Sequence, residues 1–211
     1  DHVRVADQTL SFEELVNLAY MNRVQLSATG YYRTPKIHYD REQASGRPFY
    51  YYANGAAVSE VLVDTLTGEY RITRVDICHD AGDSLNPAID LGQIEGGFIQ
   101  GMGWLTCEEL AWNDQGQLLT VGPATYKIPA VGDTPEEFRV ELLPDSPNAE
   151  ATVFRSKAVG EPPLMLATSV WCALRDAIAS LADYRTQPPL DIPATPERVL
   201  AACNALRAGA Q

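Results

Sequence analysis

The chain has 211 residues, of which 45% are hydrophobic and 21% charged, a composition typical of a globular protein. Its formal net charge of -12 argues against binding to nucleic acid, because proteins contact phosphates with clustered Lys and Arg. No apolar run reaches the roughly 18 to 20 residues that cross a bilayer. The most apolar segment, residues 164–181, is interrupted by Thr168, Ser169, Arg175 and Asp176. We therefore expect binding to neither nucleic acid nor a membrane.

The start of the chain indicates that it is part of a longer polypeptide, and its cysteines indicate a reducing compartment. The sequence begins at Asp1 without a charged and apolar leader, so we expect a piece of a longer polypeptide. The histidines are scattered, and we assign no metal ligand. No C-x-x-C pair occurs, and free thiols acting as small core residues in the cytoplasm are expected at Cys78, Cys107, Cys172 and Cys203.

The first predicted element is a helix that follows Ser11. Ser11 and Glu14 have the spacing of a capping box, and the apolar residues after them share one face of a helix that runs to about Asn22. A stretch rich in loop-forming residues follows. Its aromatic residues either pack within the protein or contact a neighbour: Tyr31, Tyr32, Tyr39, Phe49, Tyr50, Tyr51 and Tyr52.

The middle of the chain alternates between strand and helix patterns. Segments 57–64 and 70–78 are rich in β-branched residues and flank turn residues, which predicts a β-hairpin. A helix is predicted over residues 89–105, after Asn86 and Pro87. Further strands are predicted at residues 117–121 and 138–143, with another at 152–154.

Two helices are predicted near the C-terminus. The apolar spacing of residues 164–181 predicts a core helix preceded by Pro162 and Pro163. Thr195 is expected to cap a last helix whose first residue is Pro196. Together these elements predict an α+β fold with a mixed, largely antiparallel sheet packed with helices, in one domain over residues 1–211.

Five glycines fall within the helix predicted over residues 89–105. Each costs about 1 kcal/mol of helix stability relative to alanine, so their number needs a reason. Either another helix packs closely against this one, or a bulky cofactor approaches its backbone. The five are Gly92, Gly96, Gly97, Gly101 and Gly103.

Two polar residues stand out beside these features. Gln93 follows Gly92 at the start of the glycine-rich helix, and its amide can donate to and accept from an oxygen ligand. Glu161 precedes Pro162, which favours an extended backbone at the entrance to the apolar helix. There the helix N-terminus favours the carboxylate while burial favours the neutral acid, a balance that suits a general base. The alternatives are a surface glutamine and an exposed carboxylate that complements the helix dipole.

Five segments in order resemble the molybdenum subunit of the xanthine dehydrogenase family. They cover most of the chain, and the fourth resembles the family's signature around its catalytic glutamate. The segments are residues 26–35 (LSATGYYRTP), 84–96 (SLNPAIDLGQIEG), 125–129 (TYKIP), 156–163 (SKAVGEPP) and 194–197 (ATPE). The chain therefore resembles the C-terminal portion of that subunit.

The resemblance implies a catalytic role for one residue and cofactor contacts for three. Glu161 matches the glutamate that takes a proton from a hydroxyl group on molybdenum, whose oxygen then attacks an electron-poor carbon of the purine. Gln93 matches the glutamine near the molybdenum ligands, and Gly92 and Gly160 are expected to contact the cofactor. The implied reaction is the oxidation of xanthine or hypoxanthine to urate.

The resemblance also implies cofactors and partners. A molybdenum-molybdopterin cofactor is expected between this chain and the missing part of the subunit, with iron-sulfur clusters and FAD on partner domains or subunits. NAD or oxygen is the expected final acceptor, and a higher oligomer is expected. The family's earlier cofactor motifs, substrate-clamping residues and iron-sulfur cysteines are absent from the chain, so it should be inactive alone.

Two alternatives stay open at this point. An aldehyde oxidase or another N-heterocycle hydroxylase of the same family would keep the chemistry and change the substrate. A non-catalytic assembly domain would bury its helices against a partner and use Glu161 as an exposed cap. The leading hypothesis, a purine hydroxylase, requires Glu161 and Gln93 to converge on one cleft that opens toward a missing domain.

Overall fold

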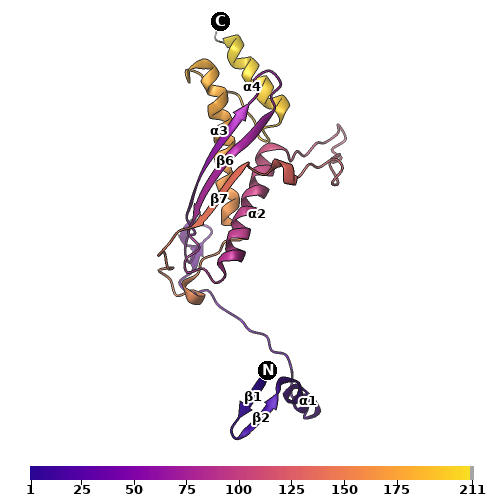
Figure 1. The fold of residues 1–211 in the computed structure, drawn as a ribbon, viewed down its shortest axis with the longest axis vertical. Helices are drawn as coiled ribbons and strands as arrows, with labels where there is room; N and C mark the ends of the chain where they lie inside the picture. Colours follow the sequence, from indigo (N-terminus) through magenta and orange to yellow (C-terminus); the bar gives the residue numbers. More distant parts are fainter. Residues whose placement is uncertain (210–211) are drawn as a thin grey trace. The chain divides into compact units, whose positions relative to one another are not determined.

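A computed structural model describes residues 1–209 of the chain (Figure 1). It contains two compact units, one formed by Asp1–Tyr50 and a larger one that begins at Tyr51. The expectation that the whole chain belongs to one domain stays a prediction, because contacts with the rest of a longer protein would decide it.

The first unit is built from short local elements. Strands β1 (His2–Val5) and β2 (Gln8–Ser11) form an antiparallel hairpin that leads into helix α1 (Phe12–Met21), and β3 (His38–Asp40) pairs antiparallel with β4 (Ser45–Arg47). The predicted capping box is confirmed, since the Ser11 hydroxyl and the Glu14 carboxylate each accept the other's backbone N–H. No residue of α1 is buried, so its apolar face is not covered within this unit.

The second unit contains a three-stranded mixed sheet. Strand β5 (Gly55–Val63) pairs antiparallel with β6 (Tyr70–His79), which confirms the predicted hairpin. Strand β7 (Glu137–Leu142) pairs parallel with β6 after a long connection that contains α2 (Pro87–Thr106). The other strand pairings are antiparallel, as predicted for an α+β protein with a largely antiparallel mixed sheet.

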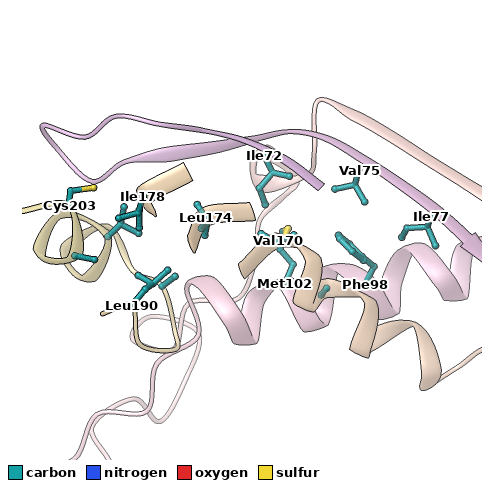
Figure 2. Packing of buried hydrophobic residues seen from close by; sticks show 14 of the residues in the cluster. Ile72, Val75, Ile77, Phe98, Met102, Val170, Leu174, Ile178, Leu190 and Cys203 are labelled. Atoms are coloured by element: carbon teal, nitrogen blue, oxygen red, sulfur yellow. The ribbon is translucent and has the colours of Figure 1, made fainter. Parts of the chain in front are cut away.

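The core lies between the sheet and two helices. The apolar segment after the prolines forms a 3-10 turn (Pro162–Ala167), then α3 (Thr168–Ala179) and a second 3-10 turn (Ser180–Ala182). Figure 2 shows Val75 of β6 facing Phe98 of α2 and Val170 of α3, and all three are fully buried. Helix α4 (Pro196–Gly209) begins at Pro196, as predicted, and adds Val199 to the same core.

Segment Pro162–Ala182 is long and apolar enough to cross a membrane by length and composition, with a mean hydropathy of 1.4 over its most apolar window. In the structure it is a core element. Val170, Leu174 and Ile178 are fully buried against the sheet and the other helices. Its apolar character is therefore accounted for by packing within this unit.

Two strand predictions are wrong. Residues 117–121 form only an isolated bridge between Leu118 and Trp112, because an Asx turn draws the chain back at Asn113, whose side chain accepts the N–H of Gln117. Residues 153–155 form a 3-10 turn (Val153–Arg155), in which Phe154 has the positive φ of 49°. The prediction of core cysteines holds for Cys203, whereas Cys172 is exposed and the other two are half-buried.

The aromatic residues of the loop-rich stretch do not form a shared core. Tyr50 is buried, whereas Tyr31 and Tyr32 are 89% and 68% exposed. Phe49 and Tyr52 are also exposed. Of the two alternatives for these rings, packing within the chain is not seen for Tyr31 and Tyr32, and a contact with a neighbouring part stays a prediction.

Candidate functional site

The glycine-rich helix α2 begins at a well-formed cap. The Asn86 side chain accepts the N–H of Ile89, and Pro87 occupies the first turn, where its missing N–H is not needed. The Ser84 hydroxyl donates to the Asp90 carboxylate in that turn. Residues 84–90 therefore fix where the helix starts, and with it the position of Gln93.

Close packing explains three of the five glycines. A β-carbon at Gly97 would lie 3.3 Å from Cβ of Pro163, and one at Gly101 would overlap the backbone oxygen of Leu164. A β-carbon at Gly103 would lie 2.6 Å from the ring of Pro129. These three allow segment Pro162–Ala167 and the loop at Pro129 to approach the helix, so a cofactor is not needed to explain them.

The other two glycines face open space. A β-carbon at Gly92 or Gly96 would meet no atom within 4 Å. Both are exposed. Each is two residues from the buried Ile94, which is about half a helical turn, so both lie on the opposite side of α2. Packing within this chain therefore does not require a glycine at either position.

Gln93 and Gly160 lie side by side although they come from separate segments. The side-chain oxygen of Gln93 is 3.7 Å from the position that a β-carbon at Gly160 would take. The backbone oxygen of Gly160 is 3.5 Å from the position that a β-carbon at Gly97 would take. The segment that carries Glu161 therefore runs along the N-terminal half of α2. Gln93, Gly160 and Glu161 are all exposed, so another molecule can reach each of them.

The local geometry at Glu161 differs from the sequence-based expectation. Glu161 has φ -104° and ψ -39°, in the helical region, although the following proline favours an extended backbone. The reason is the turn that follows, because the N–H of Leu164 donates to the Glu161 carbonyl at 3.1 Å. The Glu161 side chain makes no capping hydrogen bond and is exposed, so burial by residues of this chain does not act on its carboxyl group.

Sequence reasoning missed a buried ion pair just before Glu161. The ammonium of Lys157 donates to the carboxylate of Asp80, and their side chains are only 11% and 5% exposed. Burial raises the pKa of Asp80, but hydrogen bonds from Lys157 and from the Gly82 N–H outweigh it and lower that pKa overall. The signal that could have suggested this pair was a lysine inside the segment resembling the family signature.

Next to this pair lies a buried histidine. His79 ends β6 and is 1% exposed, and its Nδ1 has no hydrogen-bond partner among the described residues. Burial lowers the pKa of His79, Asp80 acts in the opposite direction, and the Lys157 charge lowers it further. This imidazole is therefore a core residue and does not reach the exposed surface at Gln93.

Two further segments that resemble the family, residues 125–129 and 194–197, make structural contacts within this unit. The Tyr126 hydroxyl donates to the Glu108 carboxylate, which attaches the loop of residues 125–129 to the end of α2. The N–H of Ala194 donates to the Leu105 carbonyl, and the Ala194 carbonyl accepts the Tyr70 hydroxyl. Both segments hold the core helices in place.

The exposed surface on α2 suits a large polar cofactor. Gly92 and Gly96 leave the helix backbone accessible, and Gln93 offers both an amide donor and an oxygen acceptor beside it. Glu161 adds one carboxylate at the adjoining segment. No group of three or more metal-binding side chains occurs among residues 1–209.

Comparisons with known proteins identify the family of the chain. A family model described as "Molybdopterin cofactor-binding domain" matches residues 1–135. The chain is 53% identical over 199 residues to xanthine dehydrogenase/oxidase of Felis catus and 49% identical over 203 residues to xanthine dehydrogenase of Oryza sativa subsp. japonica. Each match covers 92% of this chain and 15% of the relative.

A solved structure shares the fold. Quinoline 2-oxidoreductase from Pseudomonas putida 86 superposes with a TM-score of 0.63 at 31% identity, over 72% of this chain and 19% of that chain. The fold and the family match thus define an α+β unit of the kind that binds a molybdopterin cofactor. The chain belongs to the molybdopterin cofactor-binding domain family, and it spans about 15% of the length of the curated relatives that it matches.

Proposed function

We propose that this chain supplies part of the active site of a xanthine dehydrogenase-type oxidoreductase, which hydroxylates xanthine or hypoxanthine to form urate. The observation that carries the proposal is the juxtaposition of Gln93 and Gly160, which places the residue before Glu161 beside the exposed Gln93 side chain of α2. The names of the relatives in cat and rice support the substrate class.

In this proposal some residues of the chain contact the cofactor and one transfers a proton. When bound, the molybdenum-molybdopterin cofactor supplies an acidified hydroxyl group and accepts the two electrons of the oxidation. Gly92 and Gly160 carry no side chain that would hold the cofactor away, and the Gln93 amide would hold it through hydrogen bonds. The Glu161 carboxylate would act as the general base that takes up a proton during hydroxylation of the purine.

The rest of the enzyme comes from other chains or segments. The exposed carboxylate of Glu161 needs the remainder of the molybdenum subunit to exclude water from it and to clamp the purine. Iron-sulfur clusters and FAD on partner domains or subunits carry the electrons to NAD or oxygen, in a cytoplasmic assembly of several subunits. This chain alone is expected to be inactive.

The test is urate formation by the complete enzyme, assembled with its electron-transfer partners. Glu161→Gln is compared with the parent at equal molybdenum content, and kcat is expected to fall by about 10²- to 10⁴-fold, the loss typical of a missing general base. Glu69→Gln, in the exposed turn between β5 and β6, is the matched control and should leave kcat unchanged. Unchanged turnover in Glu161→Gln would favour the assembly-domain alternative, in which Glu161 is an exposed cap.

A second candidate substrate class has a specific observation in its favour. The structurally similar Pseudomonas enzyme is named for quinoline, an N-heterocycle that is not a purine. An enzyme of that kind, or an aldehyde oxidase, would keep the roles of Glu161 and Gln93. Failure of the active parent enzyme to form urate, combined with oxidation of quinoline or an aldehyde, would replace the purine by that substrate.

A further inference from the structure

The segment that carries Glu161 is anchored on both sides within a few residues. On its C-terminal side Pro163 is buried and the backbone of Leu164 packs directly on Gly101 of α2. On its N-terminal side the N–H of Ala158 donates to the Tyr51 hydroxyl at 3.0 Å, and the N–H of Lys157 donates to the Ala81 carbonyl at 2.7 Å. The backbone at Gly160 and Glu161 therefore has little freedom to shift.

The strongest part of the N-terminal anchor is the ion pair between Lys157 and Asp80. Asp80 itself is held by its own N–H, which donates to the Asn54 carbonyl at 2.8 Å, and by the Gly82 N–H, which donates to its carboxylate at 3.0 Å. A buried ion pair adds little net stability compared with apolar side chains of the same volume. What it provides is a defined geometry, because each charge tolerates only positions close to the other.

The same anchor also sets the start of α2. Residues 80–86 connect the end of β6 to the helix cap, and they are joined to the Glu161 segment by a backbone bridge between Gly82 and Ser156. The N–H of Asp83 donates to the Arg155 carbonyl at 3.1 Å. Gly82 has a φ of +63°, and a β-carbon there would overlap the Arg155 carbonyl, so this close approach requires glycine.

We propose that the Asp80–Lys157 ion pair is a positioning device that fixes the backbone of Glu161 relative to Gln93 in the active site. The inference rests on the proposed function, because that function assigns Glu161 as the general base and Gln93 as a cofactor contact. Asp80 and Lys157 act through the segments that they join, and neither contacts the substrate. A displacement of about 1 Å at a catalytic group can lower turnover by ~10²-fold, so such a device has a measurable effect.

The test uses the complete enzyme and removes both charges together. In D80N/K157M the two side chains keep nearly the same volume, and no unpaired charge is left in the core. The matched control is E109Q/R198M, which removes the half-exposed ion pair between Glu109 and Arg198 near α4. Each enzyme is measured for melting temperature, molybdenum content, kcat and KM, and for hydrogen exchange of the amides of Ala158, Gly160 and Glu161.

The expected result separates positioning from stability. D80N/K157M should keep its melting temperature and molybdenum content, lower kcat about 10- to 100-fold with little change in KM, and speed exchange at the three amides by at least ~10-fold. The control should change neither kcat nor exchange in this segment. In the triple variant D80N/K157M/E161Q, kcat should be no lower than in Glu161→Gln alone, because both changes act on one step.

Two outcomes overturn the inference in distinguishable ways. If Glu161→Gln loses turnover while D80N/K157M keeps it, the positioning role is wrong and the proposed function stands. If Glu161→Gln keeps full turnover, the general-base function is wrong and the inference fails with it. If D80N/K157M does not fold, Lys157→Arg replaces it, since that variant keeps both charges but changes the geometry of the pair; unchanged kcat and unchanged exchange at Ala158 would then reject the proposal.

Discussion

The side-chain oxygen of Gln93 lies 3.7 Å from the position that a β-carbon at Gly160 would occupy. This distance corresponds to ordinary van der Waals contact, so a methyl group fits between the two segments and a larger side chain does not. The glycine at this position is therefore not required by packing within the chain. The lack of a side chain at Gly160 affects only a molecule that approaches the exposed surface of Gln93 and Gly160.

Gly160→Ala should accordingly separate folding from cofactor binding. We expect the free energy of unfolding to change by less than ~0.5 kcal/mol, because the added methyl group is exposed and meets only Gln93. The molybdenum content of the complete enzyme should fall, since the methyl group occupies the cofactor surface. Metal analysis and thermal unfolding check both parts, with Gly209→Ala at the open end of α4 as the control. A cofactor content equal to that of the parent would remove Gly160 from the site.

The glycines of α2 should respond to alanine in opposite directions. Gly101→Ala places a β-carbon 2.9 Å from Cβ of Ala167 and onto the backbone of Leu164, so we expect a loss of about 1 to 3 kcal/mol in unfolding free energy. Gly96→Ala meets no atom within 4 Å and should gain up to ~1 kcal/mol from helix propensity. Chemical denaturation measures both values. A loss of similar size at both positions would contradict the division of the glycines into packed and open ones.

Local patterns in the sequence predict those elements whose residues interact with near neighbours. The capping box of Ser11 and Glu14 and the hairpin of β5 and β6 are examples, because each depends on a few residues close in sequence. The juxtaposition of Gln93 with the Glu161 segment was expected only from the family resemblance, since helix periodicity does not state which loop packs against which helix.

The features that were not predicted depend on contacts between distant segments. Asp80 and Lys157 meet because the end of β6 and the loop before Glu161 are joined by backbone hydrogen bonds, and neither residue lies in a pattern that signals a partner. The backbone of Glu161 departs from the preference of residues before proline because Leu164 closes a turn onto its carbonyl. In both cases tertiary contacts outweigh a local preference.

Tyr70→Phe should lower the free energy of unfolding, because it removes a hydrogen bond to the segment before α4. Burial, the main cause, raises the pKa of Tyr70 to about 12, so its hydroxyl stays protonated and donates to the Ala194 carbonyl at 2.9 Å. Removing the hydroxyl leaves that buried carbonyl without this donor, and we expect unfolding to become easier by about 0.5 to 1.5 kcal/mol. Denaturant unfolding provides the value, and Tyr39→Phe at an exposed tyrosine of the first unit is the control. Equal stability of Tyr70→Phe and the parent would mean that the hydrogen bond is not formed in solution.

Stability of the second unit should decline as the pH falls below about 6.5, and His79 should be one cause. Burial is the main reason that the pKa of His79 is lowered in the folded chain, whereas in the unfolded chain it returns to about 6.5. The fold therefore favours the neutral imidazole. The contribution of His79 to the free energy of unfolding is complete above the pKa of the unfolded state, about 6.5. It is lost as the pH falls through and below that pKa, by at most ~1.4 kcal/mol per pH unit.

The measurement is the unfolding free energy of the complete protein between pH 8 and pH 5. His79→Gln cannot take up the proton and should show a smaller loss over this range, whereas His38→Gln, at an exposed histidine, should follow the parent. Asp80 does not complicate the comparison, because its pKa is lowered from 3.8 and its contribution is lost only at more acidic pH. Parallel pH profiles for the parent and His79→Gln would show that this imidazole is not kept neutral by its burial.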